Sequence, residues 1–155
     1  MKKIFAVAML VLSSFAASCF AQSPMYGHAD NITLQTPNNY ACFPVNQNGT
    51  GAPNPYTCTG FGTLVTSSTT FTSLTAIIDR PVTGSHRVAI IAEDFTTGNN
   101  IGINNCVITV GQMACTVTIS SFGSVSAGDV IAVKVWDDLS GTNYYNLEHI
   151  TWVLQ

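Results

Sequence analysis

Short runs of strand-forming residues recur along most of this 155-residue sequence, and no window carries the apolar spacing of an amphipathic helix. Each run is rich in Val, Ile, Thr and aromatic residues, which favour extended strands. Turn-forming residues separate the runs, so the pattern predicts an all-β chain. The predicted strands cover residues 31–36, 68–78, 86–95, 106–110, 114–120, 130–136 and 148–154.

Alternation within the runs indicates which side of each strand is buried. Ile131, Val133 and Val135 fall on one face, because successive side chains of a strand point to opposite faces of the sheet. The run at 87–92 is apolar on both faces. A strand of that kind is covered on both sides, which predicts a central position or an oligomer interface.

Residues 1–21 show the three-part pattern of a secretory signal. Lys2 and Lys3 precede an apolar run at 4–12, and small residues follow that run. The small residues predict cleavage before Gln22. We therefore expect a secreted protein, periplasmic or extracellular.

Cys19 allows a second interpretation of the leader. The sequence before it forms a loose lipobox, in which Cys19 would carry a lipid anchor. Ala16 stands where a consensus box has Leu, so we favour release over anchoring.

Charge limits the partners of the mature chain. Removal of the leader leaves three cations, Arg80, Arg87 and Lys134, against eight carboxylates, a formal net charge of −5. This excess excludes electrostatic capture of nucleic acid or anionic membrane. No further run approaches the roughly 18 apolar residues of a membrane span.

The cysteines that follow the leader predict cross-links. Their number is even in an exported chain, which favours two disulfides over free thiols. Of the three pairings, we favour Cys42–Cys58 and Cys106–Cys115, because each closes a short local loop. Neither spacing suits a zinc site. The staple at 42–58 would close a Pro- and Gly-rich excursion and stabilise it by about 3 kcal/mol.

The second pair predicts a register if the two cysteines lie opposite each other in an antiparallel hairpin. Residues 109–112 would then form the turn between Cys106 and Cys115, with Gly111 free to adopt positive φ. A tighter turn would place the cysteines on a diagonal, beyond ordinary disulfide reach.

Several of these motifs together resemble a known family. The run Arg-Val-Ala-Ile-Ile-Ala at 87–92, the cysteine pair and the Ala-Gly-Asp turn at 127–129 before a Val-Ile-Ala-Val strand are similar to the second half of C1q/TNF-like jelly-roll domains. The resemblance covers residues 68–136. Such domains are head modules of bacterial surface filaments and phage tail fibres. The resemblance implies a jelly roll, homotrimers and surface recognition, and it implies no catalytic residues. The sequence departs from the family in two respects: it has no collagen-like repeat, and its N-terminal cysteine loop is not part of the family pattern.

The best polar cluster combines Asp137 and Asp138 with Glu148 and His149. Paired carboxylates serve glycoside hydrolases, which makes a small secreted glycosidase an alternative function. With Asn143, the two aspartates also form a weak calcium candidate. Turn formation is the simpler role for adjacent aspartates before a polar loop, so we predict no catalytic residue and no required cofactor.

Aromatic residues in the loops are the predicted contact points. Tyr144 and Tyr145 precede the last strand, and Phe43 and Tyr56 belong to the first cysteine loop. Their rings would offer flat surfaces to a sugar or a protein, unless they pack into the edge of the core.

These observations predict one antiparallel β-sandwich domain at 22–155, working as a non-enzymatic recognition or structural module. No Gly-x-Ser-x-Gly motif or unpaired cysteine supplies a nucleophile. The expected partner is a protein or glycan surface ligand, and a carbohydrate-binding role belongs to the same class.

Overall fold

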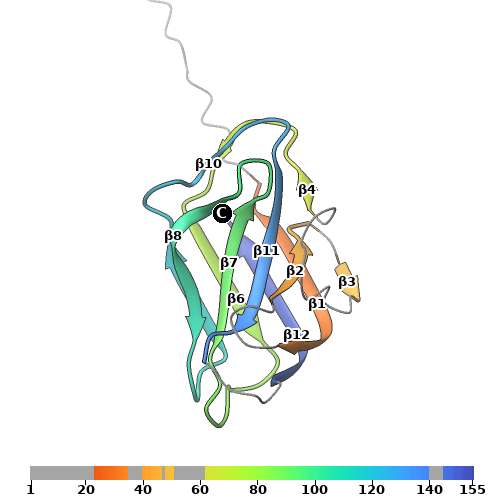
Figure 1. Cartoon of the computed structure of the whole chain (residues 1–155), viewed down its shortest axis with the longest axis vertical. Coiled ribbons are helices and arrows are strands. Elements are labelled where there is room, and N and C mark those ends of the chain that lie inside the picture. The colour runs from red at the N-terminus through yellow and green to blue at the C-terminus, as the bar shows by residue number, and fades with distance from the viewer. Residues whose placement is uncertain (1–22, 35–39, 47, 51–61, 140–144) are drawn as a thin grey trace, which may run out of the picture.

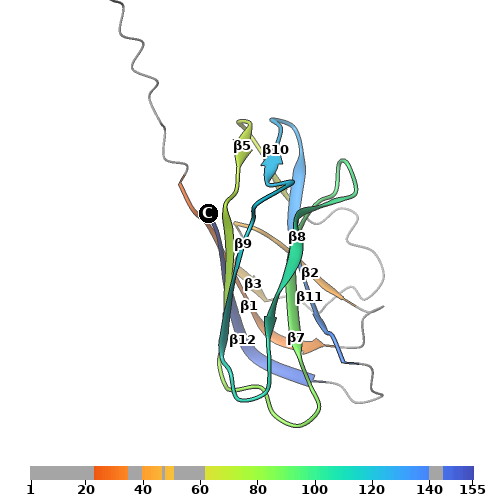
Figure 2. The same ribbon diagram turned by 90° about the vertical axis from the view of Figure 1, so that its left-hand side faces the viewer.

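The computed structural model describes residues 23–34, 40–46, 48–50, 62–139 and 145–155. Within these ranges the chain forms strands and their connections, and no helix that could cross a membrane. The main strands make two sheets that face each other, as the edge-on view of Figure 2 shows. The prediction of an all-β chain is confirmed, and the architecture is that of a β-sandwich. The predicted leader at 1–21 lies outside the described residues.

The first sheet has the strand order β3-β1-β12-β6-β9. Its strands are β1 (Met25–Leu34), β3 (Asn48–Thr50), β6 (Ser73–Ile78), β9 (Ala114–Thr118) and β12 (Tyr145–Leu154). Neighbours pair antiparallel except β1 and β3, which run parallel. β1 begins six residues before the predicted start, at Met25 instead of Asn31, and pairs with β12 along nearly its whole length.

The second sheet has the order β2-β11-β7-β8, and a short β4 also pairs with β11 (Figure 1). Its strands are β2 (Ala41–Pro44), β4 (Thr63–Leu64), β7 (Val88–Asp94), β8 (Asn99–Ile108) and β11 (Val130–Asp137). A small separate ribbon joins β5 (Thr69–Thr70) to β10 (Ser124–Val125). The proline-rich excursion contributes β2 only as an edge strand, since Pro44 cannot donate to a ladder.

The inner faces of the two sheets form one core. Ile131, Val133 and Val135 of β11 are fully buried, and Ile150 and Trp152 of β12 meet them from the other sheet's side. The face predicted from alternation is therefore correct for β11.

β7 lies between β11 and β8, so its predicted central position is confirmed. Its outward residues Ala89 and Ile91 are also buried, at 0% and 3% exposed, although they lie outside the main core cluster. Side chains of neighbouring strands cover this outer face. The burial of both faces of β7 therefore follows from contacts within one chain and does not require an oligomer interface.

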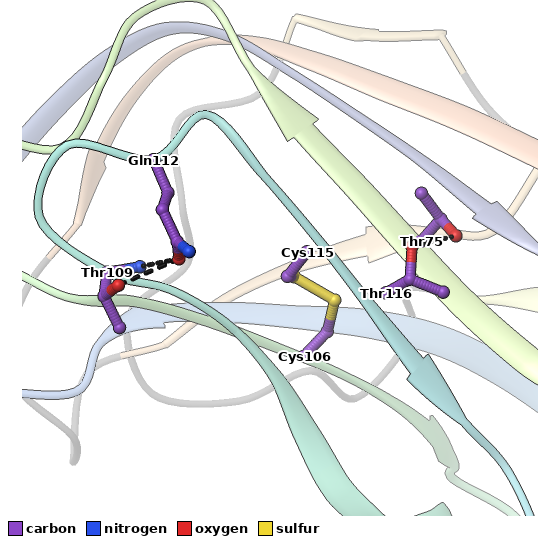
Figure 3. The surroundings of a disulfide bond; sticks show 6 residues. All are labelled: Thr75, Cys106, Thr109, Gln112, Cys115 and Thr116. Atoms are coloured by element: carbon purple, nitrogen blue, oxygen red, sulfur yellow. Dashed lines mark hydrogen bonds between the residues drawn. A yellow bond between two sulfur atoms is a disulfide. The ribbon is translucent and has the colours of Figure 1, made fainter.

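The Cys106–Cys115 disulfide is present, with 5.6 Å between the Cα atoms (Figure 3). The hairpin register predicted for it is wrong. Cys106 lies on β8, which pairs with β7, and Cys115 lies on β9, which pairs with β6. The bond therefore joins the two sheets. At this point the backbones of β8 and β9 are closer than the ~10 Å that separates stacked sheets.

The connection between β8 and β9 is a crossover from one sheet to the other. The backbone N–H and the hydroxyl of Thr109 both donate to Oε1 of Gln112, at 3.2 and 2.8 Å (Figure 3). Gly111 has φ of 81°, as predicted for this turn. The same nine-residue spacing fits a crossover as well as a hairpin, because both bring the Cα atoms within disulfide reach.

The other predicted disulfide, Cys42–Cys58, involves Cys58, which lies outside the described residues. Cys42 itself is on β2, opposite Lys134 of β11. That pairing stays a prediction.

Replacing both Cys106 and Cys115 by Ala is expected to lower the free energy of unfolding by about 2–3 kcal/mol, because the bond closes a short loop and clamps the two sheets. Urea denaturation of the variant and the wild type measures the change. In excess reductant the difference between them should shrink. An unchanged unfolding midpoint under oxidising conditions would show that the clamp adds nothing.

Candidate functional site

Asp137, the first of the predicted acidic residues, ends β11 and is 2% exposed. Its Oδ2 is 2.5 Å from Nδ1 of His86, and its Oδ1 accepts from the backbone N–H groups of Arg87 and Leu139, at 3.0 and 3.2 Å. These contacts tie the segment before β7 to the end of β11. Asp137 therefore has the environment of a structural carboxylate, closed off from a substrate.

Asp138 and Glu148 are occupied by different partners. Asp138 pairs with the Arg87 guanidinium and accepts the indole N–H of Trp136 at 3.3 Å. Glu148 is exposed and 3.7 Å from Nη1 of Arg80. The structure does not bring the three predicted carboxylates together around a shared space.

Asn143, the third predicted calcium ligand, lies outside the described residues, so that site stays a prediction. Within the part of the chain that the structure describes, no group of three or more His, Cys, Asp or Glu residues is arranged to hold a metal ion.

The histidines form contacts that the sequence did not reveal. Nδ1 of His149 on β12 pairs with Oδ1 of Asp30 on β1, and Nε2 of His28 lies 3.9 Å from Oδ2 of the same carboxylate. The two imidazole rings are 5.3 Å apart. All three residues are partly exposed, on the outer face of the first sheet. Only the β1–β12 register could have found this cluster, because its members are far apart in the sequence.

Two of the four predicted contact aromatics belong to the interior. Phe43 is 4% exposed and packs 5.5 Å from Trp152, and Tyr145 is 6% exposed and packs 4.8 Å from His86. Both continue the inward alternation of their strands, so neither ring offers an exposed flat surface. Tyr144 and Tyr56 lie outside the described residues.

Burial raises the pKa of the Tyr145 hydroxyl above its ordinary value of 10.0, although the nearby Arg80 partly offsets this. Below that value both folded and unfolded chains keep the phenol protonated. At higher pH the unfolded chain ionises first, so the stability contribution is lost as pH rises. We expect Tyr145→Phe to remove this alkaline loss in urea midpoints measured between about pH 9 and pH 11. The same substitution at exposed Tyr26 is the matched control, and an identical slope in both variants would contradict the assignment.

A groove on the outer face of the second sheet gathers a different set of side chains. It has a volume of about 270 Å³, and its lining residues are Tyr40, Ile91, Asn100, Asn105, Lys134 and Trp136. We call it the Trp136 groove. Lys134 lies opposite Ile91 in the β11–β7 ladder, and Trp136 lies opposite Ala89. Ile91 is nearly buried and forms the floor.

The charge in the Trp136 groove is internally balanced. Nζ of Lys134 pairs with Oε2 of Glu93, and the two side chains are only 16% and 10% exposed. The same ammonium lies 4.4 Å from the ring centroid of Tyr40 and 5.4 Å from that of Phe95. These are the distances of cation–π contacts.

The amide side chains of the groove are free. Asn100 and Asn105 are exposed, and within the described residues neither side chain makes a hydrogen bond. Asn105 lies in a bulge of β8, since the partners of β7 jump from Cys106 at Ile90 to Ile101 at Ala92, and Asn100 is paired with Glu93 beside it. Bulges of this kind re-aim side chains and recur next to functional sites.

A larger hollow, of about 500 Å³, lies between residues 23–25, Asn46 and the segment 64–69. The described residues that line it carry hydroxyl, amide and aliphatic groups, with no aromatic ring and no charge. It offers less chemistry for specific recognition than the Trp136 groove, which we take as the candidate site.

Comparisons with protein-family models, with curated proteins and with solved structures find no match to this chain. None of them identifies a C1q/TNF-like domain.

Proposed function

We propose that this chain is an exported, non-enzymatic recognition module that binds a surface ligand in the Trp136 groove. The observation that carries the proposal is the contrast between two regions. Asp137 and Asp138 are committed to His86, Arg87 and backbone donors, whereas the groove presents half-buried aromatic rings beside free amides. Rings and polar groups converging on a concave surface are typical of binding sites.

Export is supported by two independent features. The leader at 1–21 has the secretory pattern. The Cys106–Cys115 bond is of the kind that persists in oxidising compartments such as the periplasm or the cell exterior.

The strand order supports a jelly roll as the finer description of the sandwich. β1-β12-β6-β9 faces β2-β11-β7-β8, and most connections cross between the sheets, as in jelly rolls built from two Greek keys. The implied homotrimer rests on the C1q/TNF resemblance alone, because neighbouring side chains already cover Ile91. Light scattering after size exclusion distinguishes a trimer from a monomer.

The test of the proposed function is binding to arrays of oligosaccharides and peptides by the full chain, purified after export. Trp136→Ala should reduce the array signal at least about tenfold, as truncation of a central aromatic contact does. Tyr26→Ala is the matched control, since this exposed aromatic lies on the other sheet. Equal signals from the two variants, or hydrolysis of a bound oligosaccharide, would contradict the proposal.

A further inference from the structure

We infer that the ligand of the Trp136 groove is an uncharged saccharide chain. The inference rests on the proposed function and adds the chemical class of the ligand. Three properties of the groove carry it: its charge balance, its polar groups and its size.

The charge balance disfavours an acidic ligand. Arg80, Arg87 and Lys134 are the cations of the described residues, and each has a carboxylate partner. Lys134 in particular is held by Glu93 and two aromatic rings. An anionic ligand would therefore find no free cation in the groove, and the mature chain as a whole would repel it. A cationic ligand would compete with Lys134 for Glu93, whose side chain is only 10% exposed.

The available polar groups suit hydroxyls. Each of the Asn100 and Asn105 amides has a donor and an acceptor, and a sugar hydroxyl takes both roles. The apolar face of a pyranose ring packs on aromatic side chains such as Trp136 and Tyr40, while the amides hold its rim. The indole of Trp136 is already fixed, because its N–H donates to Asp138. A preorganised ring loses little freedom on binding.

The size of the groove suits a short stretch of a saccharide chain. Its volume of about 270 Å³ lies just below the range of ligand sites, which run from about 300 to 1,000 Å³. A folded protein partner needs a far broader contact, about 800 Å² per side. A sugar ring fits, and the rest of the oligosaccharide can extend along the open side of the groove into solvent.

Titration calorimetry tests the class with three sets of probes: cellohexaose, mannohexaose and N-acetylchitohexaose as uncharged chains, oligogalacturonate and oligoalginate as acidic chains, and array-selected peptides. We expect at least one uncharged chain to bind, with an affinity that stays constant from low to high salt, because no ion pair is formed. Asn100→Ala with Asn105→Ala should weaken that binding about tenfold. Asn104→Ala is the matched control, since Asn104 is an exposed neighbour in the same bulge and does not line the groove.

The outcomes separate this inference from the proposed function. Preferential binding of an acidic chain or a peptide that Trp136→Ala abolishes would overturn the inference of an uncharged saccharide and leave the recognition module standing. Failure of all probes to bind in a Trp136-dependent manner would overturn both.

Discussion

Replacing Trp152 by Ala is expected to lower the free energy of unfolding by about 3–5 kcal/mol. The side chain is 1% exposed and packs 5.5 Å from Phe43 across the core. Its indole N–H donates to the backbone oxygen of Val45 at 3.3 Å, so the variant loses this bond as well as the volume of the ring. Urea denaturation followed by circular dichroism measures the loss. A decrease below about 1 kcal/mol would show that the sandwich does not depend on this contact.

Gly27 provides a control for the same prediction. An added Cβ there would lie 2.5 Å from three atoms of the Trp152 indole. Gly27→Ala should therefore destabilise the wild type by about 1–3 kcal/mol through overpacking. It should cost less in a Trp152→Phe background, because the smaller ring leaves room. Additive effects of the two substitutions would contradict the close packing of these residues.

The second large effect is expected at the ion pair on the outer face. Lys134→Met alone should destabilise by about 3–5 kcal/mol, because it leaves the mostly buried Glu93 carboxylate without its partner. The double variant Glu93→Met with Lys134→Met should recover most of the stability, since two apolar side chains of similar size carry no desolvation cost. The measurement is the urea midpoint of each variant at neutral pH.

The exposed pair Arg80–Glu148 is the matched control for that experiment. Glu148 has a side chain 78% exposed, so Glu148→Gln should change stability by less than about 1 kcal/mol. If Lys134→Met lowered the free energy of unfolding as little as Glu148→Gln, Glu93 and Lys134 would not form a tight buried pair in the groove. The charge argument for an uncharged ligand would then fail as well.

Most of the long strands were predictable, because alternation is a local property of the sequence. The first, polar part of β8 at 99–105 and the short strands β2, β3, β4 and β10 were not predicted, because they lack that apolar alternation. The inward positions of β11 and the central place of β7 follow from which residues are apolar at every second position. Tyr145 and Phe43 carried the same signal, since each shares its face with another buried residue, Leu147 and Ala41. They were predicted as surface contacts because both lie in or beside loop-rich segments.

The partners of the strands were not predictable, because pairing joins residues that are far apart in the chain. The spacing of Cys106 and Cys115 leaves open whether β8 and β9 share one sheet, and the structure places them in two. The Trp136 groove was not predictable for the same reason, because its lining comes from four separate segments: β7, β8, β11 and the residue before β2. A signal existed only in part: Lys134 and Trp136 alternate with the core residues of β11, and so face outward beside a strand that is apolar on both faces.

The most direct test of the Trp136 groove uses the two tryptophans as reporters, since the sequence contains only Trp136 and Trp152. Their indole N–H groups give two signals in a ¹⁵N–¹H correlation spectrum, which Trp136→Phe assigns. On addition of cellohexaose, mannohexaose or N-acetylchitohexaose, we predict that the Trp136 signal shifts in a saturable manner while the core Trp152 signal stays in place. Saturating binding of any of these chains that leaves the Trp136 signal unmoved would contradict the account.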